Sequence, residues 1–371
     1  MTNGNNQYYG RSLICQNILE RIAYEHDKMQ SDEYNCEEIR KQELAFLFQE
    51  SNVNSARLEA ELVLAPDLRP VDGKISKKIL EQKARELAHQ VNEAWQLGVY
   101  KYEGVLTEEL LLDIGQLIDP ISNRGHSFRS SSANLAEDLS AIDFTKLTSQ
   151  PGYEGYLNRF LREVNNNQVF YSRTNDQSEP ITLVEKAVYS HFMIFYLQPL
   201  MDGNKRTARI VQNLMLKDRD IPPPVIYDFE NSEYIGLILD AFRARRVREG
   251  NSLPNVFISK QEHKFFDYMG AKVLGALKKV NDILDSKKTF FVKLLDCKDT
   301  RPSYISAKRA LTSLISRRDV NGAVRYDSSE GNLKVRGNVT SEDIRAVLDS
   351  IHTIRAYTID FGKGKHLSRK L

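Results

Sequence analysis

Apolar residues recur at three- and four-residue spacing through most of the first 250 residues. This spacing is typical of helices that bury one face, and strand-like alternation is scarce in the same part of the chain. The pattern therefore predicts a mainly helical body. Its clearest helical segments are "SLICQNILERIAYEHDKM", "EEIRKQELAFLFQ", "ILEQKARELAHQVNEAWQL", "TEELLLDIGQLI" and "EGYLNRFLREVN".

Two more helices are expected on either side of a polar segment, "QPLMDGNKR". The run "TLVEKAVYSHFMIFYLQ" predicts a helix that ends near Pro199, because proline disfavours helical geometry in the residue before it. A second helix is expected within "DGNKRTARIVQNLMLKD" and cannot continue through the prolines at 222–224. The first amide groups of that second helix lack partners within the helix and, with the positive end of its dipole, favour an anion.

The residues at the start of this second helix suit a phosphate. Gly203 lets the backbone approach an anion closely, and Asn204 can donate from its side chain. Three cations follow, at Lys205, Arg206 and Arg209. Helical spacing places Arg209 on the face of the other two, where its planar guanidinium can hold a second phosphate. Asp202, just before the helix, is placed to hold a Mg²⁺ ion that bridges two phosphates.

The chain after residue 255 follows a different pattern. A linker is expected at 248–255, "REGNSLPN", and helices are expected at 262–284 and 303–318. A hairpin is predicted in "AVRYDSSEGNLKVRG", with its turn at Glu330 and Gly331. These elements predict a separate C-terminal module.

Charge supports this division. The net charge of the chain is +2, but from Lys287 to Leu371 there are 18 Lys and Arg residues against 9 Asp and Glu residues. The part before Lys287 is therefore mildly acidic and the end of the chain is basic. Such a contrast indicates a separate module or an acidic partner.

Composition excludes several classes of protein. The 371 residues are 41% hydrophobic and 27% charged, which is ordinary for a globular chain of two or three domains. Three scattered cysteines form neither a disulfide framework nor a metal-binding spacing, which favours a reducing compartment. No apolar stretch is long enough to span a membrane, and the start "MTNGNNQYYG" lacks the features of a signal peptide. We expect a cytoplasmic protein with no membrane partner.

The polar segment resembles the signature of the Fic/Doc (Fido) family, H-P-F-x-D-G-N-G-R-x-x-R. Six of its residues match in order: Pro199, Asp202, Gly203, Asn204, Arg206 and Arg209. Lys205 matches a variant form of the motif, Leu200 replaces the aromatic residue, and Gln198 stands in the place of the histidine. The flanking helix and "GHSFR" at 125–129 also resemble the family, which implies a helical Fic core over residues 105–248. His191, in that flanking helix, is expected to be a buried core histidine.

A second element that resembles the family lies upstream, in "ESNVNSARLEAEL". Ser55 and Glu59 have the S-x-x-x-E arrangement of the family's inhibitory helix, expected here near residues 51–62, and at this spacing they share a helix face. The resemblance implies that Glu59 pairs with Arg209 and keeps the terminal phosphate of ATP from docking productively. Residues 1–104 are then an N-terminal helical region that includes this helix.

The resemblance also implies a reaction, which is the transfer of AMP from Mg·ATP to a hydroxyl of a target protein. Asp202 would hold the metal and the helix start would stabilise the departing pyrophosphate. A histidine would take the proton of the hydroxyl, a step worth about 10² to 10⁴ in rate. The amide of Gln198 cannot take that proton, although it can orient a hydroxyl or a water molecule. We therefore expect weak, altered or absent catalysis.

Three explanations of Gln198 remain open. The protein is a pseudoenzyme that binds a nucleotide and responds to it, or a slow transferase that uses another base, such as Asp202 or a residue of a partner. The third explanation is an engineered inactivating substitution. Lys205 adds a question about the group transferred, because the Doc branch carries Asn-Lys-Arg and transfers the terminal phosphate. A homodimer is compatible with the family.

The basic module at 256–371 is open to two interpretations. A helix with Lys308, Arg309, Arg317 and Arg318, followed by a hairpin with Arg325, Lys334 and Arg336, is the order of a winged-helix DNA binder. The alternative is a solvated face or a module that docks on a protein. The expected fold class is thus mainly α, with a smaller basic C-terminal α+β module.

Overall fold

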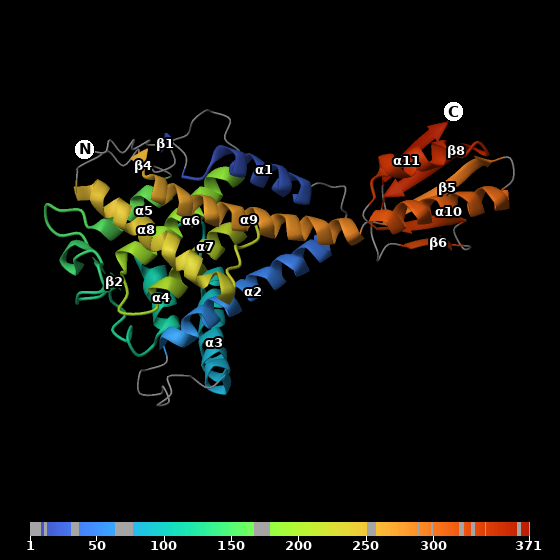
Figure 1. Ribbon diagram of the computed structural model, residues 1–371. Coiled ribbons are helices and arrows are strands. Elements are labelled where there is room, and N and C mark those ends of the chain that lie inside the picture. Colours follow the sequence, from blue (N-terminus) through green and yellow to red (C-terminus); the bar gives the residue numbers. More distant parts are fainter. Residues whose placement is uncertain are drawn as a thin grey trace. The chain divides into compact units, whose positions relative to one another are not determined.

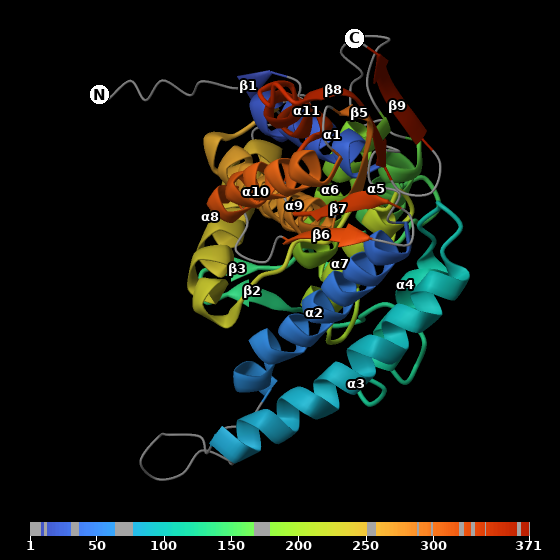
Figure 2. The ribbon, with the colours of Figure 1, turned by 90° about the vertical axis from the view of Figure 1, so that its right-hand side faces the viewer.

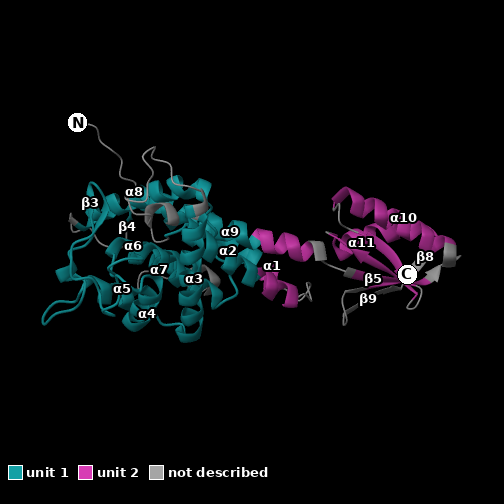
Figure 3. Ribbon diagram, turned by 90° about the horizontal axis from the view of Figure 1, so that it is seen from below, with its two compact units in different colours: residues 1–26, 44–277 teal, residues 27–43, 278–371 magenta. Residues whose placement is uncertain are grey.

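The computed structural model describes residues 9–10, 13–30, 37–63, 77–166, 179–250, 257–287, 289–297, 300–318, 323–327, 331–337, 339–361 and 365–370. The chain divides into two compact units (Figure 3). The first comprises residues 1–26 and 44–277, and the second comprises residues 27–43 and 278–371. The finer boundaries expected from the sequence, at 104, 248 and 256, stay predictions.

Helices make up most of the chain, as predicted (Figure 1). The long helices are α1 (Gln16–Gln30), α2 (Glu37–Val63), α3 (Lys77–Lys101), α4 (Glu108–Ile118), α5 (Tyr156–Asn165), α6 (Glu179–Leu197), α7 (Asn204–Lys217), α8 (Asn231–Gly250) and α9 (Lys260–Lys287). Two antiparallel strand pairs accompany them, namely β1 (Tyr9–Gly10) with β4 (Phe257–Ile258), and β2 (Asn134–Ala136) with β3 (Leu139–Ser140). Among the described residues, no helix is both long enough and apolar enough to cross a membrane.

The core of the first unit forms around α6. Its residues from Val184 to Leu197 are buried, and it packs along α7, which in turn contacts α3 and α4 (Figure 2). Phe192 of α6 contacts the rings of Phe242, Phe265 and Phe266 at centroid distances of 5.0 to 5.6 Å. A helix that is apolar on all sides must be enclosed by others, because each exposed side chain would forgo about 1.5 to 3 kcal/mol of burial.

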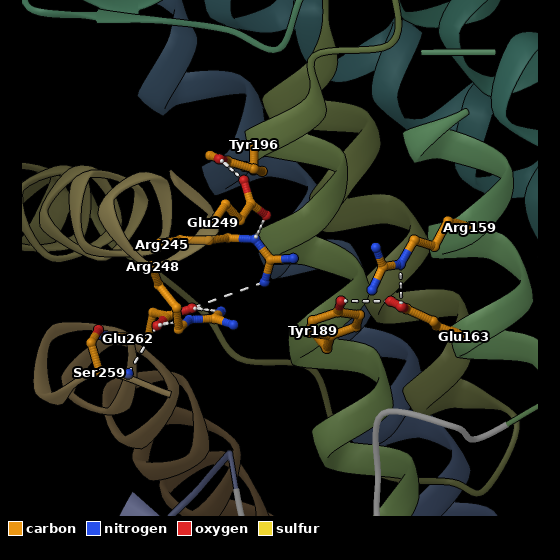
Figure 4. Close-up of polar contacts among 9 residues, drawn as sticks. All are labelled: Arg159, Glu163, Tyr189, Tyr196, Arg245, Arg248, Glu249, Ser259 and Glu262. Carbon is orange, nitrogen blue, oxygen red and sulfur yellow. Dashed lines mark hydrogen bonds and ion pairs between the residues drawn. The ribbon is translucent and has the colours of Figure 1, made fainter. Parts of the chain in front are cut away.

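A buried ion network joins α8 to α9 (Figure 4). Glu262 is fully buried, and its carboxylate accepts from Arg248 at 2.6 Å and lies 3.9 Å from Arg245. The backbone N–H of Ser259 also donates to it, at 2.9 Å. Helix α8 continues to Gly250, through the first residues of the linker predicted at 248–255, and Arg248 has a buried partner there. Residues 251–255 lie outside the described residues.

The second unit contains a five-stranded antiparallel sheet in the order β6-β7-β5-β8-β9. Its elements in chain order are β5 (Thr289–Cys297), α10 (Thr300–Arg318), β6 (Ala323–Asp327), β7 (Asn332–Arg336), α11 (Ser341–Asp349), β8 (Ile354–Phe361) and β9 (Lys365–Lys370). Both helices contact the sheet, and their apolar residues close one core with it. The first six elements follow the β-α-β-β-α-β connectivity of split βαβ folds.

The winged helix, one of the two interpretations of this module, is not shown by the structure. The helix and the hairpin exist where they were expected, and Gly331 has the positive φ of 63° that a turn requires, although Glu330 lies outside the described residues. However, both belong to a larger sheet with β5 at its centre. β5 pairs with β7 and β8, which lie far along the chain, and residue spacing does not report such pairing.

Candidate nucleotide site

The segment between α6 and α7 turns on Gly203. This residue precedes the first residue of α7 with φ 79° and ψ 9°, a left-handed conformation that favours glycine. A Cβ atom added there would lie 2.3 Å from Cγ2 of Ile118 in α4. Both constraints exclude a side chain, so the backbone itself forms the entrance to the first turn of α7, where the amide groups of a helix attract an anion.

Asn204 holds the loop together. Its Oδ1 accepts from the N–H of Leu200 at 2.8 Å, and its Nδ2 donates to the Leu200 carbonyl at 2.9 Å and to Oε1 of Gln198 at 3.1 Å. The side chain is buried. Its bonds to Leu200 and Gln198 thus fix the conformation of the loop. Its expected donation to a phosphate stays a prediction.

Arg206 turns toward α4. It is 3% exposed, and its Nη1 donates to the carbonyl of Ile118 at 3.1 Å, at the C-terminal end of that helix. Burial lowers the pKa of Arg206, and the carboxylates of Glu59 and Asp202 oppose that shift. The guanidinium thus joins α7 to α4 and adds positive charge behind the loop.

Glu59 and Arg209 lie together, as the family resemblance implied, and Ser55 joins them. Nη1 of Arg209 lies 3.5 Å from Oε1 of Glu59 and donates to Oγ of Ser55 at 3.1 Å. Nζ of Lys205 lies 3.4 Å from the other carboxylate oxygen of Glu59. One carboxylate from α2 therefore faces two cations of α7. The inhibitory role of this contact stays a prediction.

Arg209 has more donors than the described residues satisfy. It is 6% exposed, and its Nε and Nη2 are buried with no hydrogen-bond partner among the described atoms. Its guanidinium lies against the ring of Tyr234 in α8, with Cζ 5.3 Å from the ring centroid, which is a cation–π distance. A buried donor without an acceptor costs about 1 to 3 kcal/mol. Such a group fits an anionic ligand.

Behind Arg209 lies the buried pair His191 and Tyr234. Nε2 of His191 lies 2.7 Å from the Tyr234 hydroxyl, and its Nδ1 contacts Oε1 of Gln212. Burial, with a contribution from the charge of Arg209, lowers the pKa of His191 to about 3. His191 is thus a neutral core histidine, as predicted. Tyr234, by contrast, is a neighbour of the site that sequence reasoning missed.

Gln198 occupies the end of α6 in an unusual conformation. Its φ is 48°, which few residues other than glycine adopt. Its Nε2 donates to the Phe195 carbonyl at 2.9 Å, and its own carbonyl accepts from Nε of Arg129. The N–H of Arg129 also donates to the Pro199 carbonyl at 2.9 Å. The "GHSFR" segment therefore fixes the backbone at the position where the family motif has its histidine.

Asp202 lies at the outer edge of the loop. It is exposed, and its Oδ1 accepts from the N–H of Gly203 at 2.5 Å. Partial burial of the carboxyl and the neighbouring Asp119 raise the pKa of Asp202. Carboxylate oxygens are the ligands that Mg²⁺ prefers, so the group fits the metal expected there.

Asn123, which the sequence did not single out, supports this edge of the loop. It is buried, its Nδ2 donates to the carbonyls of Gly115 and Asp202 at 2.8 and 3.1 Å, and its Oδ1 accepts from the N–H of Met201 at 3.0 Å. Only the fold brings it there, because it lies 79 residues before Asp202.

Comparison with known proteins identifies the segment that contains this loop. Residues 105–216 match the Fic/DOC family. The chain contains a Fic domain. The matched residues include α4, α6 and all but the last residue of α7, and thus the whole loop around Gly203.

Among curated proteins, the Fic domain is similar to the protein adenylyltransferase Fic of Drosophila persimilis, with 29% identity over 94 residues, or 25% of this chain and 17% of that protein. The corresponding protein of Nematostella vectensis is 37% identical over 51 residues, or 14% of this chain and 12% of that protein. The matched segment thus spans less than a fifth of these relatives.

Among solved structures, a Fic domain containing signaling protein from Bacteroides thetaiotaomicron aligns with a TM-score of 0.49 and 18% identity, over 72% of this chain and 96% of that one. Fic-1 from C. elegans aligns with a TM-score of 0.47 and 13% identity, over 71% of each chain.

Proposed function

We propose that this Fic domain binds Mg·ATP at the N-terminus of α7. In the reaction of adenylyltransferases, a protein hydroxyl attacks the α-phosphorus, the bond to pyrophosphate breaks, and the proton of the hydroxyl leaves to a base. We propose that this step is slow or absent here, because Gln198 offers no base.

The observation that carries the proposal is the buried guanidinium of Arg209. In the part of the chain that the structure describes, its Nε and Nη2 have no hydrogen-bond acceptor. Arg209 lies in the second turn of α7, a helix that begins directly after Gly203. A phosphate would supply acceptors to a charge that is already desolvated. Bonds between charged groups are worth about 1.5 to 3 kcal/mol each. Lys205 would add charge at the entrance, and Asp202 would hold the Mg²⁺ ion.

We further propose that Glu59 restrains nucleotide binding. Its carboxylate lies 3.4 Å from Lys205 and 3.5 Å from Arg209. It therefore pairs with the two cations that a terminal phosphate would bind. Ser55, from the same face of α2, adds an acceptor to Arg209. Removal of the carboxylate should therefore tighten nucleotide binding.

Two alternatives share this site. Lys205 gives the motif an Asn-Lys-Arg sequence, which supports transfer of the terminal phosphate in place of AMP. The other alternative is a regulatory pseudoenzyme, which binds the nucleotide, performs no transfer, and signals through its C-terminal module. The involvement of Gln198 in loop contacts supports this second alternative, because its amide already bonds to Phe195 and Asn204.

One experiment separates these functions. Isothermal calorimetry with Mg·ATP measures binding by the native chain, by Glu59→Gly and by Arg209→Ala. We expect tighter binding for the first variant and weaker binding for the second, and absence of ATP binding in all three would overturn the proposal. Intact mass after incubation then distinguishes an added AMP, an added phosphate or no change.

We also propose a protein target, a homodimer and a cytoplasmic location. A protein target with an accessible hydroxyl follows from the reaction, and a homodimer and a cytoplasmic location remain compatible with the chain. Labelling of a cell extract with a tagged ATP analogue by Gln198→His in the Glu59→Gly background would identify the target.

A further inference from the structure

The sheet of the second unit has one covered face and one open face. Side chains that point toward α10 and α11 are buried, among them Val292, Leu333 and Val335. Successive residues of a strand point to opposite faces, so the intervening residues form the other face. They include Phe291 and Lys293 of β5, Lys334 and Arg336 of β7, and Arg325 and Asp327 of β6, and Phe291 pairs with Asp360 of β8.

The open face is accessible and basic. Lys293, Arg325 and Arg336 are exposed, and the side chain of Lys334 is 42% exposed. Leu295, at an irregularity in the pairing of β5 with β8, is 48% exposed. The face therefore combines positive charge with an aromatic side chain that is partly exposed.

Strand register places these residues in one row. Arg325 pairs with Lys334, and Lys334 pairs with Phe291. Neighbouring strands lie about 4.8 Å apart, so two cations and an aromatic ring share a strip roughly 10 Å wide. Arg336 follows two residues further along β7. In this strip, the aromatic ring and the cations therefore lie on neighbouring strands, several ångströms apart.

Phe291 is the aromatic residue of the strip. It is partly exposed, and Nζ of Lys334 lies 5.5 Å from its ring centroid. Lys334 also pairs with Asp327 at 2.6 Å. The side chains of this pair are 42% and 20% exposed, so a phosphate that binds Lys334 would compete with Asp327 for it.

We propose that this face binds single-stranded nucleic acid. A base would stack on Phe291, and phosphates would bind Arg325, Lys334 and Arg336. A four-stranded antiparallel sheet that stacks bases on its aromatic side chains is a known platform for single-stranded RNA. Similar connectivity alone assigns no function, and the proposal depends on the side chains of the strip.

The strip fits a single strand better than a duplex or a protein. In a duplex the bases are stacked on one another and are closed to Phe291, whereas an open strand offers both bases and phosphates. An acidic protein segment would use the cations but would leave the ring without a specific partner. The net charge of the chain from Lys287 onward, with twice as many basic as acidic residues, favours a polyanion.

The test uses the full chain and fluorescence anisotropy with labelled probes: oligouridine, oligothymidine and a DNA duplex of similar length, in low salt. We expect both single strands to bind more tightly than the duplex. Phe291→Leu, which keeps an apolar side chain, should weaken binding by at least about fivefold, because stacking is lost. Arg325→Gln combined with Arg336→Gln should weaken it by about tenfold or more.

A charge-matched control comes from the opposite side of the unit. Lys308→Gln with Arg309→Gln removes the same charge from the exposed surface of α10, and it should leave single-strand binding within about twofold. Equal loss in both double variants, tighter binding of the duplex, or no binding of either strand would overturn the proposal. Thermal unfolding of each variant checks that it is folded. ATP binding by the first unit is a separate measurement, so this proposal and the proposed function can fail independently.

Discussion

The start of α7 and the open sheet face are both basic, but they hold their charges differently. At α7, Arg206 and Arg209 are 3% and 6% exposed and contact a main-chain carbonyl, a serine and a carboxylate. On the sheet, Arg325 and Arg336 are exposed to solvent. The first arrangement fixes direction and distance, whereas the second provides charge density with little fixed geometry.

The difference indicates which kind of ligand each site suits. A buried guanidinium has already lost its water and its freedom to rotate, so a small anion of the correct shape gains much from meeting it. Exposed cations retain their hydration and act through a screened field, which suits a long polyanion of variable sequence. The comparison predicts that substitutions and salt will affect the two sites differently.

The largest expected effect comes from Arg209. Arg209→Ala should weaken Mg·ATP binding by about 10- to 100-fold, because it removes charge-assisted bonds worth about 1.5 to 3 kcal/mol. Arg336→Ala should leave ATP affinity unchanged. Calorimetry measures both.

Because Arg209→Ala also removes the partner of Glu59, Arg209→Lys serves as a second variant that keeps the charge and loses the planar fork. An ATP affinity that is the same in the native chain and in both Arg209 variants would contradict the assignment.

Acid should destabilise the first unit through His191. The pKa of His191 is about 3 in the folded chain against an ordinary value of 6.5, so below pH 6.5 the unfolded chain binds a proton that the folded chain excludes. Stability therefore falls as the pH falls, by about 2 kcal/mol between pH 6.5 and about 5 from this group.

Hydrogen exchange separates the two units in this experiment. Lower pH should increase opening of α6 and α7, after correction for intrinsic exchange rates, and should leave β5 and β7 unchanged. In His191→Gln the acid sensitivity of α6 and α7 should shrink. An equal response of native chain and variant would assign the effect to other groups.

Salt should affect the open face more than the start of α7. If three cations contact phosphates, single-strand affinity should fall about 20-fold between about 50 and about 200 mM salt. ATP binding should change much less over that range, because a buried pair is screened weakly. Parallel titrations measure both slopes, and equal slopes would remove the distinction between the sites.

The smallest expected effect comes from the glycine before α7. Gly203→Ala should destabilise the chain by at least about 1 kcal/mol, because alanine is strained at positive φ and its Cβ meets Ile118. Gly236→Ala in α8 is the matched control, since a Cβ there meets nothing within 4 Å and alanine should stabilise the helix by about 0.5 to 1 kcal/mol. Chemical denaturation compares the two.

Local signals in the sequence predicted local structure well. Pro199 indicated the end of α6, which is Leu197, and Gly203 indicated the start of α7. Glu59 was placed near Arg209 only through the resemblance to a family, and the two groups are 3.5 Å apart. Local structure can therefore be predicted from single residues with strong backbone preferences and from motifs that span a whole loop.

Partners that are main-chain atoms or distant residues could not be predicted. Arg206 contacts the main-chain carbonyl of Ile118, and every residue type has such a carbonyl, so the sequence does not mark it as a partner. Tyr234 contacts Arg209 from α8, a helix that begins after the matched family region. The central strand β5 follows directly on the pattern of a long helix. Its pairing with β7 and β8 decides the fold of the second unit, and this pairing depends on contacts across many residues.

The central claim is that the Fic domain binds the nucleotide and that Gln198 limits the transfer. Intact-mass measurement after incubation with Mg·ATP, on Glu59→Gly and on Glu59→Gly with Gln198→His, tests it most directly. We predict that only the double variant gains the mass of AMP, while both bind ATP. An equal gain of mass in the chain that keeps Gln198 would contradict the account.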